Sequence, residues 1–147
     1  MKKNSQLIIF VVVLATISLF WRLYGLNQQG PFWVDEFSTA NQARLLIANG
    51  IGVLTNQNIF FEHHNFTTYI AAALSMIALG ESEFAARLPF AIIGAFVPIA
   101  VFFLTKRLFD TRAAIAAAIL STFSYFLITW SRQARGYVIL QLAILIT

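Results

Sequence analysis

The sequence predicts an all-helical integral membrane protein. Of its 147 residues, 59% are hydrophobic and only 11% are charged, and the mean hydropathy is +0.76. Soluble proteins carry about 25% charged residues, so this composition excludes a soluble hydrolase. Three apolar stretches also have the length of a membrane-spanning helix, and the first begins within ten residues of the amino terminus.

Charge and cysteine content exclude further classes of protein. The net charge is +4, but no basic stripe of the kind that binds nucleic acid is visible, so we expect no nucleic-acid partner. The sequence has no cysteine, which excludes disulfides and thiolate zinc sites.

Residues 7–24 are the first predicted membrane-spanning helix. A helix of this length measures about 27 Å, close to the thickness of the hydrocarbon core. Trp21, Arg22 and Tyr24 are interpreted as a belt at the membrane interface, and Gly25 as the end of the helix. No small-x-small cleavage site follows the apolar run, so the segment is not a removable signal peptide.

Residues 25–87 are predicted to form one long loop outside the membrane. Asp35 or Glu36 can begin a helix over about 35–48. The apolar segment 66–79 would measure about 21 Å as a helix, which is too short for a comfortable span. We expect both segments to be juxtamembrane helices that lie on the membrane surface.

The second and third predicted spans are residues 88–105 and 113–130. Pro98 is expected to kink the middle of the second span. The apolar run 136–147 is too short to cross the membrane and is interpreted as the start of a fourth span. We therefore expect this chain to be the N-terminal part of a longer protein.

The positive charges predict the topology. If 66–79 stays in the interface, five basic residues fall together on the cytoplasmic side; if it crosses the membrane, three of them fall outside. These residues are Lys2, Lys3, Lys106, Arg107 and Arg112. We therefore predict a cytoplasmic amino terminus and an extracytoplasmic 25–87 loop.

The adjacent carboxylates of Asp35 and Glu36 are the first candidate site. The chain has only six acidic residues, and these two stand together just after Pro31, Phe32 and Trp33. One carboxylate can take a proton from an acceptor hydroxyl, while the other orients it, binds the acceptor or helps to hold a divalent ion. The alternative is a helix cap, because an acidic residue at a helix start contributes about 0.3–1 kcal/mol. The rigid, amphipathic flank favours the functional interpretation.

Arg132 and Arg135 are the second candidate site. Three residues apart, they share one face if the segment is helical and can then bind one phosphate together. The alternative is a pair of interfacial arginines beside Trp130 and Tyr137. The predicted topology brings both to the same side as Asp35, which favours phosphate binding.

His63 and His64 are the third candidate site. Adjacent histidines cannot both face one metal from a helix, so they form a weak ligand set and no metal site is assigned. A polar contact to substrate or lipid phosphate is one interpretation, and an ordinary solvated loop is the other. Arg87, which follows Glu81 and Glu83, is interpreted as an interfacial anchor.

Four motifs together carry a resemblance to a known family. They are 33–36 (WVDE), 80–89 (GESEFAARLP), 105–109 (TKRLF) and 131–137 (SRQARGY). The chain resembles the N-terminal module of polyprenyl-phosphate-sugar-dependent glycosyltransferases of the GT-C fold, in the branch of protein mannosyltransferases and aminoarabinose transferases. The resemblance covers nearly the whole chain, in the right order.

The resemblance implies roles for the candidate residues. Asp35 would be the base and Glu36 its partner, and 66–79 would be the second juxtamembrane helix of the first external loop. Arg132 and Arg135 would line the side of the lipid phosphate.

Two departures from the family pattern matter. The family often carries His-Pro-Pro before the apolar segment, and here His63 or His64 would take the role of that histidine. The acidic residues that follow the last motif in oligosaccharyltransferases are absent, since 138–141 reads VILQ. That absence argues against a metal-bound site of the oligosaccharyltransferase kind, and a divalent cation remains an open cofactor.

The predicted protein is thus the N-terminal part of an inverting membrane glycosyltransferase. It would move a sugar from a polyprenyl-phosphate carrier to a lipid, glycan or protein hydroxyl on the outer face of a prokaryotic plasma membrane. Family members have further helices, so the 147 residues alone are expected to be inactive. The alternative is a non-catalytic membrane subunit or a polyprenyl-lipid-binding module.

Overall fold

The computed structural model describes residues 2–50 and 66–147, and every regular element within these ranges is helical. The elements are α1 (Lys2–Leu23), the short 3-10 helix η1 (Leu26–Gln28), α2 (Val34–Asn49), α3 (Phe66–Leu79), α4 (Glu83–Ala95), α5 (Val97–Leu108), α6 (Thr111–Phe123), α7 (Tyr125–Ser131) and α8 (Tyr137–Ile146). Two segments of the described chain are long and apolar enough to cross a membrane, or three if one bent helix pair is a single span. The predicted all-helical membrane fold is confirmed.

α1 provides the first membrane-spanning segment. It ends at Leu23, and Gly25 follows with a φ of 63°, in the left-handed region that glycine adopts without strain. The chain therefore turns away from the helix axis where the sequence predicted its end. The next residues form η1, whose Leu26 is buried.

α4 and α5 together form the second membrane-spanning segment, Glu83–Leu108, with 26 residues. The two helices meet at Phe96, two residues before Pro98. Pro98 lies in the first turn of α5, where the missing N–H has no helical acceptor in any case. The helix assignment is thus interrupted just before Pro98, where the sequence predicted a kink, and α4 and α5 still form one candidate span.

α6 and α7 occupy the third predicted span, but they are bent by 57° at their junction. Ser124 has an extended backbone there, and its hydroxyl accepts the N–H of Leu127 at 3.4 Å. This N-cap bond begins a new helix in a new direction. The sequence predicted one straight segment here and gave no proline that would mark the bend.

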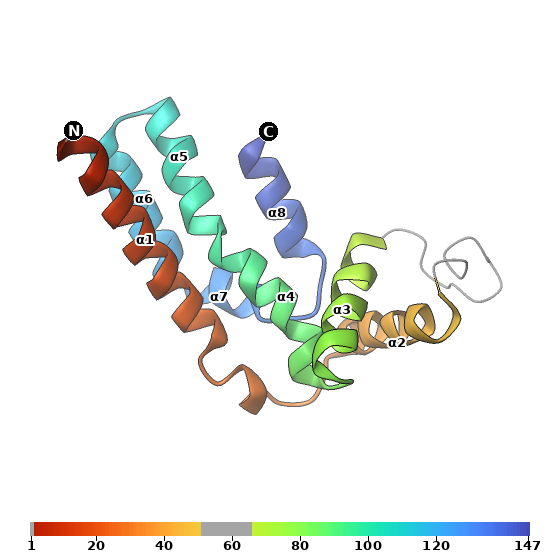
Figure 1. Ribbon diagram of the computed structural model, residues 1–147. Helices are drawn as coiled ribbons and strands as arrows, with labels where there is room; N and C mark the ends of the chain where they lie inside the picture. The colour runs from red at the N-terminus through yellow and green to blue at the C-terminus, as the bar shows by residue number, and fades with distance from the viewer. Residues whose placement is uncertain (1, 51–65) are drawn as a thin grey trace.

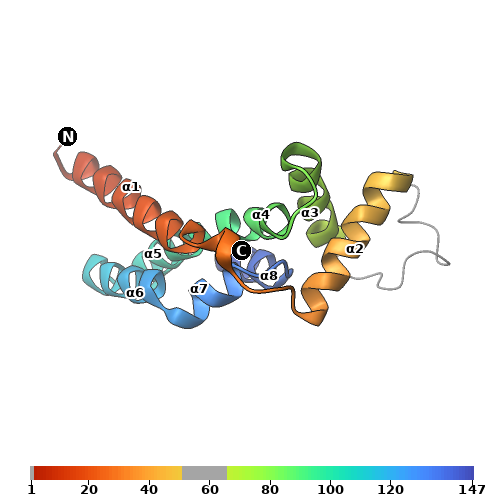
Figure 2. The same ribbon diagram turned by 90° about the horizontal axis from the view of Figure 1, so that it is seen from below.

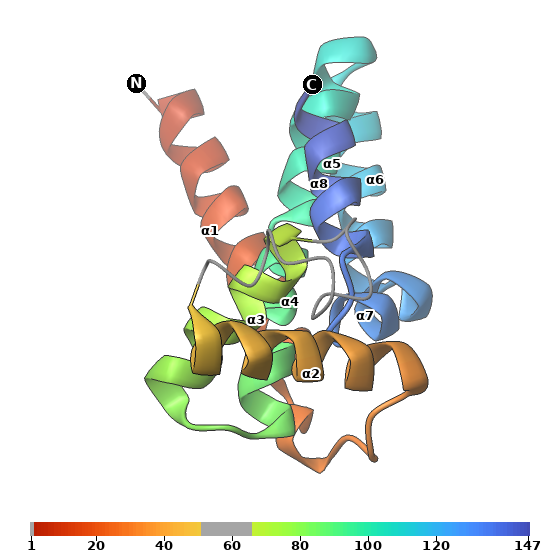
Figure 3. The same cartoon turned by 90° about the vertical axis from the view of Figure 1, so that its right-hand side faces the viewer.

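Most of the helices form a bundle, and α2 lies across one end of it. α1, α5, α6 and α8 lie side by side, with the amino terminus, the α5–α6 connection and the carboxyl terminus at one end (Figure 1). α2 lies across the other end, close to α3 (Figure 3). Seen from below, α4 and α8 lie between α1, α5 and α6 on one side and α2 and α3 on the other (Figure 2). The α5–α6 connection, which follows Arg107 and precedes Arg112, thus shares an end with the amino terminus.

Two apolar clusters hold this arrangement together. The larger joins α2, α3, α4 and α8 through residues such as Ala43, Tyr69, Ala72, Phe90 and Val138. The smaller joins α1, α5 and α6 through Leu14, Phe102, Ala114 and Ala118. Many of these side chains are alanines, which allow the helix backbones to approach closely.

Candidate functional site

The 132–136 loop joins α7 to α8 and carries both predicted arginines. It is not helical: the N–H of Arg132 closes the last turn of α7, and the N–H of Arg135 donates to the carbonyl of Gln133 at 2.8 Å. The premise that the two arginines share a helix face is therefore wrong. Arg132 lies beside Gly25, where an added Cβ would be 4.0 Å from its Nη2 atom, whereas Arg135 turns toward α2.

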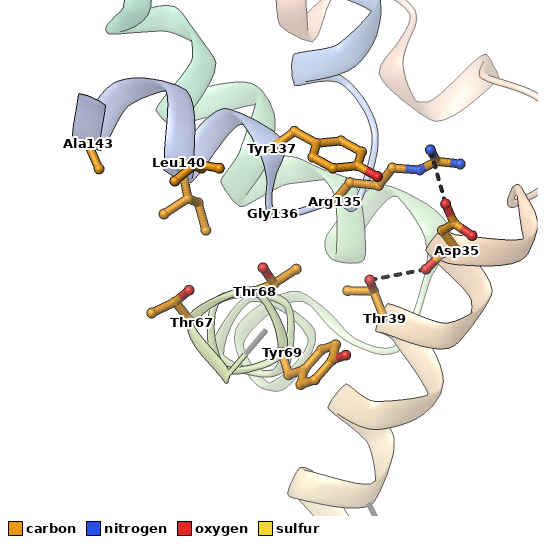
Figure 4. Close-up of a pocket in the computed structure, with 11 residues that line it drawn as sticks. Asp35, Thr39, Thr67, Thr68, Tyr69, Arg135, Gly136, Tyr137, Leu140 and Ala143 are labelled. Carbon is orange, nitrogen blue, oxygen red and sulfur yellow. Dashed lines mark hydrogen bonds and ion pairs between the residues drawn. The ribbon is translucent and has the colours of Figure 1, made fainter. Parts of the chain in front are cut away.

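Arg135 forms an ion pair with Asp35. The Nη1 atom of Arg135 lies 3.1 Å from the Oδ2 atom of Asp35, as Figure 4 shows. The guanidinium also lies over the ring of Trp130, with 5.3 Å from Cζ to the ring centroid, and Trp130 in turn contacts Tyr137 edge to face. The arginine side chain is 13% exposed and the aspartate side chain 60% exposed. A partly buried cation thus holds an accessible carboxylate.

The ion pair borders a pocket of about 580 Å³ between α2, α3 and the start of α8. Its polar wall contains Asp35, Arg135 and several hydroxyl groups, and its apolar wall comes from α8 (Figure 4). The lining residues are Asp35, Thr39, Thr67, Thr68, Tyr69, Arg135, Gly136, Tyr137, Ile139, Leu140 and Ala143. The pocket can therefore hold a ligand with a polar and an apolar part.

Glu36 points away from this pocket and pairs with Arg87 of α4. Arg87 donates from Nε to Oε1 at 2.8 Å and from Nη2 to Oε2 at 3.1 Å. Both side chains are fully enclosed, with 1% exposure for the arginine and 0% for the glutamate. Two parallel charge-assisted bonds fix the planar groups relative to one another.

Two backbone groups complete the environment of Glu36. The N–H of Ala134 donates to Oε1 at 2.9 Å, and the N–H of Trp33 donates to Oε2 at 3.2 Å. Burial raises the pKa of Glu36, but the hydrogen bonds from Arg87, Ala134 and Trp33 and the charge of Arg87 outweigh it, so the pKa lies below its ordinary value. Glu36 is therefore a buried anion with both oxygens occupied.

The Trp33 bond also settles which acidic residue caps α2. Trp33 is the N-cap residue and Glu36 is the third residue of the helix, whose carboxylate accepts the N-cap N–H. The capping role considered for Asp35 thus belongs to Glu36. The side chain of Asp35 has the ion pair with Arg135 instead.

Arg87 connects the same site to the loop before α2. It donates to the carbonyls of Gln29 at 3.4 Å and Gly30 at 3.0 Å, and it lies 4.9 Å from the ring centroid of Phe32. Its expected role as an interfacial anchor is wrong, because its side chain is buried and fully engaged. A signal did exist in the sequence: an arginine at the start of an apolar span is costly unless it is paired.

Together these bonds position the pocket. Glu36 is the neighbour of Asp35, and its bond to Ala134 fixes the neighbour of Arg135. Asp35 and Arg135 are thus each next in sequence to a residue that is hydrogen-bonded in the buried network around Glu36. Glu36 and Arg87 hold Asp35 and Arg135 opposite one another.

Comparison with known families identifies the chain. A family model described as dolichyl-phosphate-mannose-protein mannosyltransferase matches residues 63–147. The chain belongs to this family. The match contains Arg87 and the 132–136 loop, and three of the four motifs on which the resemblance rested. No curated protein and no solved structure matches the chain significantly.

Membership of this mannosyltransferase family assigns the chain to a class of membrane glycosyltransferases. The matched segment begins after Asp35 and Glu36, so the match does not include these two residues. The geometry of the site joins them to the matched segment through Arg87, Ala134 and Arg135.

Arg22 is a buried residue that the sequence interpretation placed at the interface. Its exposed fraction is 0%, and its Nη1 atom donates to the hydroxyl of Ser18 at 2.7 Å and to the carbonyl of Ser18 at 3.2 Å. It lies where α1 packs against Gly94 of α4 and Ser131 of α7. Arg22 therefore packs inside the protein, between α1, α4 and α7.

Arg132 lies near this junction and near Arg87. Burial and the charge of Arg87 both lower the pKa of Arg132, as expected for a cation with a like-charged neighbour. Its Nε atom is buried and has no hydrogen-bond partner. An anion bound beside Arg132 would relieve both effects.

Within residues 2–50 and 66–147, no three potential metal ligands come together. His63 and His64, the third candidate site of this family member, lie outside the described residues. The sequence interpretation also missed the hydroxyl-bearing wall of the pocket, because isolated threonines in an apolar segment carry no recognisable signal.

Proposed function

We propose that the protein transfers a sugar from a polyprenyl-phosphate carrier to an acceptor hydroxyl in the pocket beside Asp35. The observation that carries the proposal is the 3.1 Å ion pair between Asp35 and Arg135 at the edge of this pocket. A single displacement at a sugar carbon needs a base for the acceptor hydroxyl and a cation that stabilises the departing phosphate. Asp35 and Arg135 are groups of these two kinds.

The proposed reaction proceeds in one step with inversion. Asp35 accepts the proton of the acceptor hydroxyl while the acceptor oxygen forms a bond to the anomeric carbon of the sugar. The bond between that carbon and the phosphate oxygen breaks, and its electron pair leaves with the polyprenyl phosphate. Arg135 stabilises the negative charge that develops on the departing phosphate.

The guanidinium of Arg135 has donors to spare for this role. One nitrogen, Nη1, faces Asp35, and the buried Nε has no hydrogen-bond partner. Because a guanidinium carries five N–H groups in one plane, a phosphate can bind to Arg135 without the loss of Asp35. One rigid group would then hold both the base and the leaving phosphate.

Arg132 is proposed as a second contact to the phosphate. It is partly exposed, with an unpartnered buried Nε, and its pKa rises again when an anion binds nearby. His63 or His64 is proposed to contact the substrate or its phosphate from the segment before α3.

Glu36 is proposed to act as the partner of Asp35 by orientation. Its oxygens are occupied by Arg87, Ala134 and Trp33, which favours this role over direct binding of an acceptor or a metal. The proposed orientation puts the amino terminus in the cytoplasm and the pocket outside a prokaryotic plasma membrane, which the basic residues of the α5–α6 connection support.

The test replaces Asp35 by Asn in the native protein and measures sugar transfer from polyprenyl-phosphate-mannose in membranes. Loss of the base should lower the transfer rate by about 10²–10⁴-fold, with unchanged membrane insertion. Glu81→Gln is the matched control, because Glu81 is an exposed acid that pairs with exposed Arg44 outside the pocket. Full activity of the Asp35→Asn variant would remove Asp35 from the mechanism.

A further inference from the structure

Thr68 lies on the α3 wall of the pocket that Asp35 and Arg135 border. Its exposed fraction is 2%, and its Oγ1 atom is buried with no hydrogen-bond partner. In Figure 4 the Thr68 side chain rises from α3 toward Gly136 and Tyr137. A hydroxyl without a partner thus stands at the wall of the pocket.

Three threonines in the interiors of other helices satisfy their hydroxyl groups within the helix. Thr16, Thr39 and Thr122 each donate to the carbonyl four residues earlier, at 2.9, 3.2 and 2.7 Å. This bond is the usual one for a helical threonine. Thr68 is the third residue of α3, so its own helix has no carbonyl four residues earlier that could accept this bond. A buried polar group that lacks a partner is destabilising and calls for an explanation.

We propose that Thr68 binds a hydroxyl group of the transferred sugar. This inference rests on the proposed function, since it assigns the ligand of that pocket. A sugar hydroxyl both donates and accepts a hydrogen bond, as the threonine hydroxyl does. Rotation of Thr68 about χ1 to another staggered position can turn Oγ1 into the pocket without movement of the α3 backbone.

The positions of the charged groups favour the sugar as the ligand of Thr68. The phosphate calls for a cation, and the cation of the pocket is Arg135, on the 132–136 loop. The acceptor hydroxyl must reach Asp35, on α2. Thr68 belongs to a third element, α3, and offers a neutral donor and acceptor. The anomeric carbon of the sugar is bonded to the phosphate and is attacked by the acceptor oxygen, so the sugar lies between Arg135 and Asp35 and beside the α3 wall.

Binding of two lipids by the native protein in nanodiscs tests the proposal. The probes are polyprenyl phosphate and polyprenyl-phosphate-mannose, which differ only in the sugar. The native protein should bind the sugar-bearing lipid more tightly, and Thr68→Val should weaken that binding about 5- to 10-fold while leaving the binding of bare polyprenyl phosphate unchanged. Valine matches the shape of threonine and removes only the hydroxyl.

Two variants control for packing. Thr68→Ser keeps the hydroxyl and should retain the preference for the sugar-bearing lipid. Thr16→Val makes the same chemical change at an exposed threonine of α1 that does not line the pocket and should also retain it. If Thr68→Ser weakens sugar binding as much as Thr68→Val, the effect comes from packing and the proposal is overturned.

Deoxy donors identify the hydroxyl and separate this proposal from the proposed function. A site built to bind a hydroxyl discriminates against a substrate that lacks it. For one deoxymannose donor, the native protein should lose affinity and Thr68→Val should lose none. Two results would show that Thr68 does not bind the sugar although the protein transfers mannose. In the first, each deoxy donor loses the same affinity with the native protein as with Thr68→Val. In the second, Thr68→Val raises only the KM for the acceptor. A native protein that does not bind polyprenyl phosphate at all would contradict both proposals.

Discussion

The guanidinium of Arg87 and the carboxylate of Glu36 form two hydrogen bonds, 2.8 and 3.1 Å long, although 51 residues separate them in the chain. The pair lies out of contact with solvent and also binds the backbone at Trp33, Gly30 and Ala134. It therefore joins the start of α2, the start of α4 and the 132–136 loop at one point. The positions of Asp35 and Arg135 depend on this junction.

Removal of one member of this buried pair should be strongly destabilising. Glu36→Gln or Arg87→Met leaves a polar or charged partner uncompensated, which costs about 3–5 kcal/mol. The double variant should be less destabilised than the sum of the two single variants, because it leaves neither charge buried alone. Thermal unfolding of the purified protein in detergent measures all three. Additive effects would show that the two side chains do not interact as described.

Glu36 should also make the stability depend on pH. Its pKa in the folded protein is lower than the ordinary value of 4.5, so its contribution is fully present above about pH 4.5 and is lost as the pH falls through the folded pKa. We expect the unfolding temperature to fall below pH 4.5 in the native protein. The Glu36→Gln variant should show a flatter curve in the same range. Equal pH dependence in the two proteins would contradict the lowered pKa of Glu36.

Replacement of Arg135 by Lys tests whether one planar group serves both Asp35 and the phosphate. Lysine keeps the charge but has no planar fork and can fix only one partner at a time with comparable geometry. We expect kcat for sugar transfer to fall about tenfold or more, which corresponds to the loss of at least about 1.4 kcal/mol of transition-state stabilisation. Arg44→Lys is the control, because Arg44 has an exposed ion pair away from the pocket. A native kcat in the Arg135→Lys variant would show that only the positive charge of Arg135 is needed and not its planar group.

The apolar segments and their charged flanks determined the helices. Lengths and charges distinguished the spanning α1 and the α4–α5 segment from the short α3, and glycine and proline marked the turn at Gly25 and the break before Pro98. These features depend on neighbours in the sequence, since burial of apolar side chains in lipid and backbone preference are local properties. The adjacent carboxylates of Asp35 and Glu36 could also be selected as a candidate site from the sequence, because their adjacency is a local property.

The division of labour within that pair was decided by the tertiary structure. Asp35 and Glu36 are chemically alike and adjacent, but the 100° step between neighbouring residues of a helix turns one to the pocket and the other to Arg87. No local rule assigns Glu36 a partner on α4 or separates Arg132 from Arg135 in a loop that is not helical. These relationships arise only when α2, α4 and the 132–136 loop pack together, because a buried charge selects its partner from groups brought near by the fold and not by the sequence.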